Sequence, residues 1–246
     1  IELTESEKLE WNRVEARFDK VCSEAHQKNV PLLIDAEESW MQDAADDLVA
    51  QMMRKYNKEK AIVFFTLQMY RWDRLDYLKK LHQQAIEDGF YIGMKVVRGA
   101  YMEKERKRAK DKGYSSPIQP NKEATDRDFN ESLRFMVDHL DTVSFCAGSH
   151  NEESNLLLTT LMEEKGIATN DPRIYFAQLL GMSDHISYNL SYASYNVAKY
   201  VPYGPISDVM PYLLRRADEN TSVAGQTGRE LSLIIQETKR RKAEKK

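Results

Sequence analysis

Six short apolar runs, separated by charge-rich amphipathic segments, restrict the folds open to this chain more than any other feature. The runs cover 31–35, 61–67, 91–97, 143–147, 173–179 and 196–201. The segments between and around them, 9–29, 41–57, 71–89, 124–140, 151–165 and 184–193, are long enough for helices. Strands that alternate with helices predict βα units and a parallel sheet. Because the runs are apolar on both faces, we expect each strand to be covered on both sides.

Polar or small residues follow the runs, at the positions where a βα-barrel builds its active site. They are Asp35 with Glu37 and Glu38, Gln68, Arg98 to Tyr101, Ser149 to Asn151, Gln178 and Tyr200. An open doubly wound sheet is the alternative, but no Gly-x-Gly-x-x-Gly follows any run. A closed barrel of this type has eight strands. We therefore expect a TIM-like (βα)8 barrel with only about six strands in this chain, the N-terminal part being absent.

We expect residues 1–246 to form a single domain that ends in a basic tail at 239–246. A net charge of −3 gives no global field for nucleic acid or an anionic membrane. The two cysteines, Cys22 and Cys146, lie far apart without a CxxC pattern, which excludes a disulfide scaffold and a cysteine-based zinc site. No apolar run approaches the roughly 18 residues of a membrane span. The carboxylates near residue 35 lack a histidine or second cluster, so no metal is expected.

The segment 200–220 carries a pair of adjacent arginines. If it is a strand end followed by a helix, Tyr212, Arg215, Arg216 and Glu219 have the spacing i, i+3, i+4 and i+7 and share one face. Two guanidiniums beside a phenol suit a small carboxylate, because arginine binds it through two parallel hydrogen bonds. The alternative is a solvated basic face with the glutamate as its counter-ion.

Six motifs cover almost the whole chain in order. They are Ile34-Asp-Ala-Glu-Glu38, Gln68-Met-Tyr70, Val96-Val-Arg-Gly-Ala-Tyr101, Ser149-His-Asn151, Gln178-Leu-Leu-Gly-Met182, and Tyr200-Val-Pro-Tyr-Gly204 through Tyr212-Leu-Leu-Arg-Arg-Ala-Asp-Glu-Asn220. Together they resemble the proline dehydrogenase family, the FAD-dependent enzymes that open proline catabolism. The resemblance implies a distorted βα-barrel whose last helix lies over the strand ends and carries the arginines.

The same resemblance implies roles for individual residues. Arg215 and Arg216 would bind the proline carboxylate, and Glu219 would orient them. Tyr200 and Tyr212 would wall the ring pocket, with Leu179 packed against the substrate or flavin, and Asp35 and Tyr101 would form a carboxylate–phenol contact. The residues expected at the flavin are Gln68, Lys95, Arg98, Gly99, Ala100, His150, Asn151, Gln178 and Glu219. A core or capping role for His150 and a helix N-cap role for Asp35 are the alternatives.

Two departures from the family pattern stand out. Many bacterial members have arginine where Lys95 stands, and lysine offers a cation without the planar fork. The family's lysine on an early strand, which completes the carboxylate clamp, has no counterpart here and would belong to a missing strand. The hydroxyproline enzymes carry serine at the position of Tyr200, so the phenol favours plain proline.

The reaction implied by the resemblance is oxidation of L-proline to 1-pyrroline-5-carboxylate, by hydride transfer from C5 of proline to N5 of FAD. Electrons would pass to a quinone, at a membrane surface in the bacterial cytoplasm or on the matrix side of the mitochondrial inner membrane. The missing barrel strands would come from the same or another chain. The alternatives are a hydroxyproline dehydrogenase and a barrel fragment without catalysis.

Overall fold

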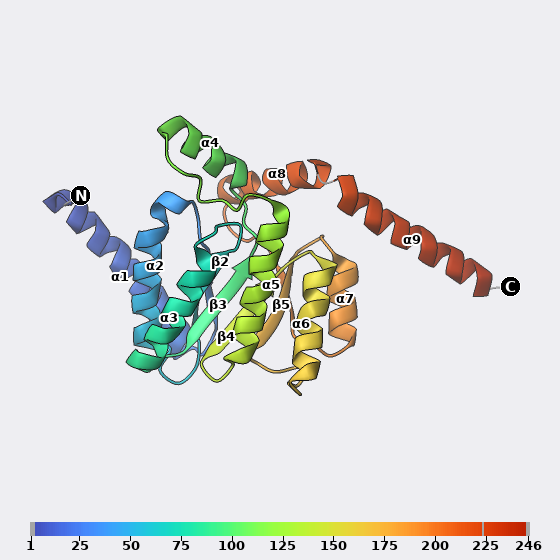
Figure 1. Ribbon diagram of the computed structural model, residues 1–246, viewed down its shortest axis with the longest axis horizontal. Coiled ribbons are helices and arrows are strands. Elements are labelled where there is room, and N and C mark those ends of the chain that lie inside the picture. The colour runs from blue at the N-terminus through green and yellow to red at the C-terminus, as the bar shows by residue number, and fades with distance from the viewer. Residues whose placement is uncertain (1–2, 223, 245–246) are drawn as a thin grey trace.

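A curved sheet of parallel strands forms the centre of the molecule (Figure 1). The computed structural model describes residues 3–222 and 224–244, with side chains for residues 3–214 and 231–243. In that part of the chain the six strands follow sequence order: β1 (Leu32–Ile34), β2 (Val63–Gln68), β3 (Ile92–Val97), β4 (Val143–Gly148), β5 (Ile174–Leu179) and β6 (Val197–Tyr200). Each strand pairs in parallel with the next, so the sheet is a half-barrel and the predicted fold class is confirmed.

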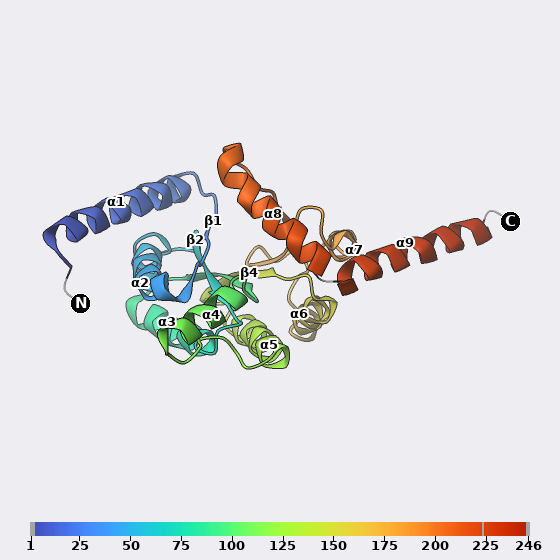
Figure 2. The same ribbon diagram turned by 90° about the horizontal axis from the view of Figure 1, so that it is seen from above.

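Helices connect the strands. α1 (Glu5–Gln27) precedes β1, and the helices after successive strands are α2 (Ser39–Tyr56), α3 (Arg74–Asp88), α5 (Lys122–Asp138), α6 (Glu152–Glu164) and α7 (Asp184–Tyr192). α4 (Met102–Lys112) is an additional helix between β3 and α5, and α8 (Ile206–Ser222) and α9 (Ala224–Glu244) follow β6. Seen from above, α2, α3, α5 and α6 lie along one side of the sheet and α8 lies on the other (Figure 2).

The hydrophobic core lies between the sheet and the helices that cover it. Phe65, Met94 and Phe145, on three central strands, are at most 1% exposed and belong to one continuous apolar cluster. Side chains alternate between the two faces of a strand. The next residues along β3 and β4, Lys95 and Cys146, are register partners and therefore lie on the opposite, concave face. The alternation of side chains thus gives the sheet one face packed against the helices and one concave face available to a ligand.

The helix ends follow local sequence signals. Asn121 and Asn151 cap α5 and α6, because each side-chain oxygen accepts a hydrogen bond from a backbone N–H of the first turn. Gly89 ends α3 in the left-handed conformation that glycine favours. The N-cap residue of α2 is Glu38, so the alternative role of Asp35 as an N-cap is wrong. The basic stretch that begins at residue 239 continues α9 as far as Glu244.

Candidate active site

The carboxyl ends of the six strands lie at one edge of the half-barrel, which we call the rim. The rim carries the residues that directly follow each strand, and α4 and α8 lie at its level (Figure 1). In parallel βα folds the loops at this edge form the active site. The predicted site residues on β2 to β6 and in the loops after β1, β3 and β4 are therefore brought to one edge of the sheet.

Lys95 is the cation at the centre of the concave face. Its Nζ forms an ion pair with Oδ1 of Asp35, which follows β1. The lysine side chain is 17% exposed and the aspartate side chain 53% exposed, so the pair has a partly buried cation and a solvated anion. Thr66 and Cys146 are the register partners of Lys95 on the neighbouring strands. Burial raises the pKa of the Cys146 thiol to about 11, so this cysteine stays protonated and is no nucleophile.

The Tyr101 phenol donates to Glu37, and the Asp35 carboxylate pairs with Lys95. The structure thus joins Tyr101 to Glu37 and Asp35 to Lys95, and the expected Asp35–Tyr101 contact stays a prediction. Gln68 lies beside this pair: its Nε2 donates to the backbone oxygen of Glu37 at 2.6 Å and so links β2 to the loop after β1. The sequence placed both acids at this strand end but could not show which one turns toward the phenol.

Small residues form the concave floor beside Lys95. Gly148, Ala177 and Ala198 are consecutive register partners across β4, β5 and β6. A Cβ at Gly148 would meet Cγ1 of Val97 at 3.0 Å, a tight contact. The floor therefore carries only glycine and alanine at these three neighbouring positions.

Aromatic side chains stand at the β6 end of this floor. The rings of Tyr200 and Tyr212 lie 5.5 Å apart and are tilted by 50°, which brings the start of α8 against the end of β6. Leu179 is the register partner of Tyr200. Tyr200 and Tyr212, the two residues expected to wall the substrate ring, thus lie together, and Leu179, expected to pack against the substrate or flavin, lies beside Tyr200 on the next strand. The backbone of α8 continues through positions 215, 216 and 219, but the side chains of Arg215, Arg216 and Glu219 lie outside the described residues.

Three residues expected at the flavin have side chains engaged by the protein. Arg98 donates to Asp126, Ser149 and Ser154, at 2.6, 2.8 and 3.0 Å. Gln178 is 2% exposed; its amide donates to the Ser149 backbone oxygen at 3.2 Å and accepts from Ser187 at 2.8 Å. The Asn151 side chain caps α6. Together these contacts form a polar layer directly beneath the rim.

The remaining two loops at the rim have constrained backbones. Gly99 has φ +129°, and a Cβ there would meet the Tyr70 ring at 2.5 Å, so only glycine fits. Gly99 and Ala100 are exposed. The Nδ1 atom of His150 lies 3.0 Å from Oγ of Ser183, which is fully buried with φ 51°. Sequence reasoning missed Ser183; the polar residue shortly after the fifth run was the available signal.

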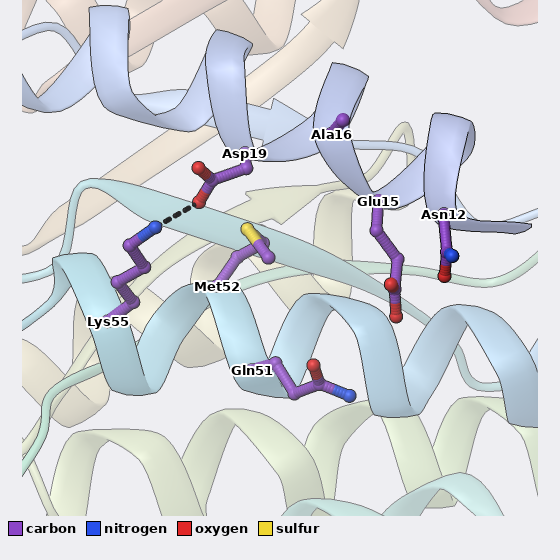
Figure 3. A pocket seen from close by; sticks show the side chains of 7 residues that line it. All are labelled: Asn12, Glu15, Ala16, Asp19, Gln51, Met52 and Lys55. Atoms are coloured by element: carbon purple, nitrogen blue, oxygen red, sulfur yellow. Dashed lines mark hydrogen bonds and ion pairs between the residues drawn. The ribbon is translucent and has the colours of Figure 1, made fainter.

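A groove of about 440 Å³ lies elsewhere, between α1 and α2. Figure 3 shows its lining, in which Lys55 of α2 pairs with Asp19 of α1 at 2.6 Å. The groove is away from the rim and contains none of the predicted site residues. Within the described residues, no helix combines the length and apolar character that crossing a membrane requires.

Comparison with known proteins identifies the family. A family model described as proline dehydrogenase matches residues 2–229. The chain is 41% identical over 241 residues to "Proline dehydrogenase 1, mitochondrial" of Homo sapiens, which covers 97% of this chain and 40% of that protein. It is 39% identical over 243 residues to "Hydroxyproline dehydrogenase" of Xenopus laevis, covering 97% of this chain and 52% of that protein. The chain thus spans about half or less of the length of these relatives.

The fold has a counterpart among solved structures. Proline utilization A (PutA) from Bdellovibrio bacteriovorus, described as inactivated by N-propargylglycine, superimposes with a TM-score of 0.80. The match covers 87% of this chain and 22% of that chain at 22% identity, so it supports the fold alone. With a family model that spans most of its length and a half-barrel of matching fold, this chain belongs to the proline dehydrogenase family.

Proposed function

We propose that this chain forms the larger part of the active site of a flavin-dependent enzyme that oxidises L-proline to 1-pyrroline-5-carboxylate. The observation that carries the proposal is the concave face itself. It combines a partly buried cation, Lys95, with a floor of small residues and a wall formed by Tyr200 and Tyr212. Such a face suits a flat ring system beside a small ring-shaped substrate.

The residues fit FAD as the cofactor. The small floor of Gly148, Ala177 and Ala198 leaves room for a planar ring system, and Lys95 supplies a positive charge beside it. When bound, a flavin would supply the oxidising chemistry by accepting a hydride from C5 of the substrate at its N5. Lys95 would place positive charge where the ring system gains electrons, which lowers the energy of that charge.

The contribution of the chain to proline itself would be binding and orientation. Arg215 and Arg216 would hold the carboxylate, an arrangement that converts a loose encounter into a near-attack geometry. Tyr200 would fill the space that a ring hydroxyl would need and so favour plain proline over hydroxyproline. No residue is assigned as a general base, because a substrate amine that is already neutral demands none.

The partners follow from the same proposal. Electrons would pass to a quinone, which places the protein at a membrane surface without requiring a spanning helix. The mitochondrial relatives support the matrix side of the inner membrane in a eukaryote, and the equivalent site in a bacterium is the cytoplasmic side. Further barrel strands would complete the wall opposite α8.

Anaerobic titration of the purified full-length protein, followed by its visible spectrum, tests the proposal. We expect a yellow protein whose flavin absorption bleaches with proline. Bleaching by hydroxyproline alone would indicate a hydroxyproline dehydrogenase, like the Xenopus relative that is 39% identical to this chain. A colourless protein that binds no added FAD would instead support the non-catalytic alternative.

A further inference from the structure

Arg98 occupies an unusual position directly after β3. Its backbone is fixed from the β2 side, because its carbonyl accepts from Tyr70 N at 2.7 Å while the carbonyl of Val97 accepts from Met69 N at 2.8 Å. The next residue, Gly99, turns beneath the Tyr70 ring. The side chain of Arg98 therefore starts from a point that neighbouring strands hold in place.

The guanidinium then reaches three elements on the helix side of the sheet. It donates to Asp126 on α5, to Ser149 after β4 and to Ser154 on α6, at 2.6, 2.8 and 3.0 Å. Its central carbon lies 4.4 Å from the centre of the Phe129 ring, a cation–π contact. The side chain is 23% exposed. Arginine suits this junction because its planar fork directs several donors at once.

The hydrogen bonds of Arg98 hold the loop 149–151. The Ser149 hydroxyl accepts from Arg98 and also from the Asn151 backbone N–H, at 3.1 Å. The Ser149 carbonyl accepts from Gln178 and from Asn155, each at 3.2 Å. His150 lies between the two fixed residues, with its Nδ1 at 3.0 Å from Ser183.

We propose that Arg98 is a positioning residue that fixes loop 149–151, and with it His150, at the rim without itself contacting the cofactor. The inference rests on the proposed function, because it assigns an indirect part in the same site. Burial alone would raise the pKa of Asp126, but the bonds from Lys122 and Arg98 outweigh it and hold that pKa below its ordinary value. The carboxylate therefore stays charged and keeps the guanidinium turned toward α5.

The rival role is direct: an arginine at this position gripping a cofactor phosphate. The two roles differ in their dependence on Ser149. A direct grip does not need the serine, so Arg98→Met and Ser149→Ala would weaken FAD binding independently. A positioning role acts through the serine, so the double variant would be no worse than the stronger single variant.

The test uses the full-length protein with Arg98→Lys, Arg98→Met, Ser149→Ala and the Arg98→Met/Ser149→Ala double variant. FAD affinity is measured by flavin fluorescence, and amide hydrogen exchange at His150 and Asn151 is measured without FAD. We expect each single variant to weaken FAD binding about tenfold. This is smaller than the roughly 100-fold loss of reaction rate that a 1 Å misplacement can cause. We also expect exchange at Asn151 to rise about tenfold in each.

Arg173→Met is the matched control. This arginine uses all three of its nitrogens, as Arg98 does, two on the carboxylate of Asp171 and one on a backbone carbonyl, but at the opposite end of the sheet. The Arg173→Met variant should leave FAD affinity and amide hydrogen exchange at Asn151 unchanged. Arg98→Lys keeps the charge and is the variant to use if Arg98→Met fails to fold.

The outcomes separate this inference from the proposed function. A wild-type protein that binds no FAD would overturn the proposed function, while exchange at Asn151 would still report on the tether. Additive losses of FAD affinity in the double variant, or unchanged exchange at Asn151 in Arg98→Lys, would overturn the positioning role in a protein that does bind FAD.

Discussion

Both ends of the half-barrel carry polar side chains, but the hydrogen-bonding and charged groups of these side chains have different kinds of partner. At the amino ends of the strands, Asn57 is fully buried and saturated. Its Oδ1 accepts from Ile62 N and Val63 N at 2.9 Å, and its Nδ2 donates to the backbone oxygens of Val63 and Tyr91 at 2.9 and 3.0 Å. At the rim, Lys95 is mostly buried but its partner Asp35 faces solvent.

The difference separates residues that hold the fold from residues that can respond to a ligand. A saturated buried amide has no bond left to offer, and its loss leaves several backbone groups without partners. An ion pair with one solvated member can exchange that member for a bound group at little cost. Stability is therefore expected to depend on the amino end, and substrate and cofactor binding on the rim.

The largest expected effect is on stability, from Asn57→Ala. The substitution removes the hydrogen-bond partner of the N–H groups of Ile62 and Val63 and of the carbonyl of Tyr91. Each buried group left without a partner costs about 1–3 kcal/mol of stability. We expect a loss of about 4 kcal/mol in the free energy of unfolding, measured by urea denaturation, with KM for proline unchanged in the protein that remains folded. A loss below about 1 kcal/mol would remove the contrast between the two ends.

Arg216→Met is expected to affect the rim alone. Loss of charge-assisted hydrogen bonds to the substrate carboxylate, worth about 1.5–3 kcal/mol, should raise KM for proline about 100-fold. FAD binding and the unfolding midpoint should change little. Arg241→Met on α9, where the arginine pairs with Glu237 at 2.8 Å, is the control and should leave KM unaltered. Unchanged proline kinetics in Arg216→Met would contradict the carboxylate clamp.

Lys95→Met should slow reduction of the flavin by proline rather than weaken proline binding. Removing the partly buried cation takes away stabilisation of developing negative charge, and we expect about a tenfold slower step in stopped-flow measurements. Lys95→Arg should restore most of the rate, because it retains the charge. Equal rates in Lys95→Met and the wild-type protein would show that the cation serves only to pair with Asp35.

The smallest expected effect concerns pH and the amino end. Burial, together with the neighbouring His139, lowers the pKa of His82, while Asp141 opposes the shift. The unfolded chain therefore binds a proton more readily, so stability is full above the ordinary histidine pKa of about 6.5 and falls as pH drops below it. We expect a loss under about 1 kcal/mol between pH 7 and pH 5.

His82→Gln tests the source of that pH dependence. Glutamine can keep a hydrogen bond to Thr142, which lies 2.9 Å from His82 Nε2, but it cannot become charged. The difference in unfolding free energy between pH 7 and pH 5 should shrink in the variant. An identical pH profile in both proteins would assign the effect to other groups.

The sequence was sufficient to predict the six strands, the helices between them and the edge at which the site lies. Those features depend on periodicity, which is local. The bonds of Glu37 to Tyr101 and to Gln68 on the next strand are tertiary, so no local pattern predicts them. The direction of Arg98 had a local signal, because it follows Val97 and the two-residue period turns it toward the helices. The two-residue period thus extends one position beyond the end of β3.

Strict chain-order pairing of the strands has a consequence for how the family can diverge. Lys95 and Tyr200 lie on β3 and β6, and these two strands are three interstrand spacings, or about 14 Å, apart across the sheet. Under the proposed function, substitutions around Tyr200 would change the space for the substrate ring without altering Lys95 on β3.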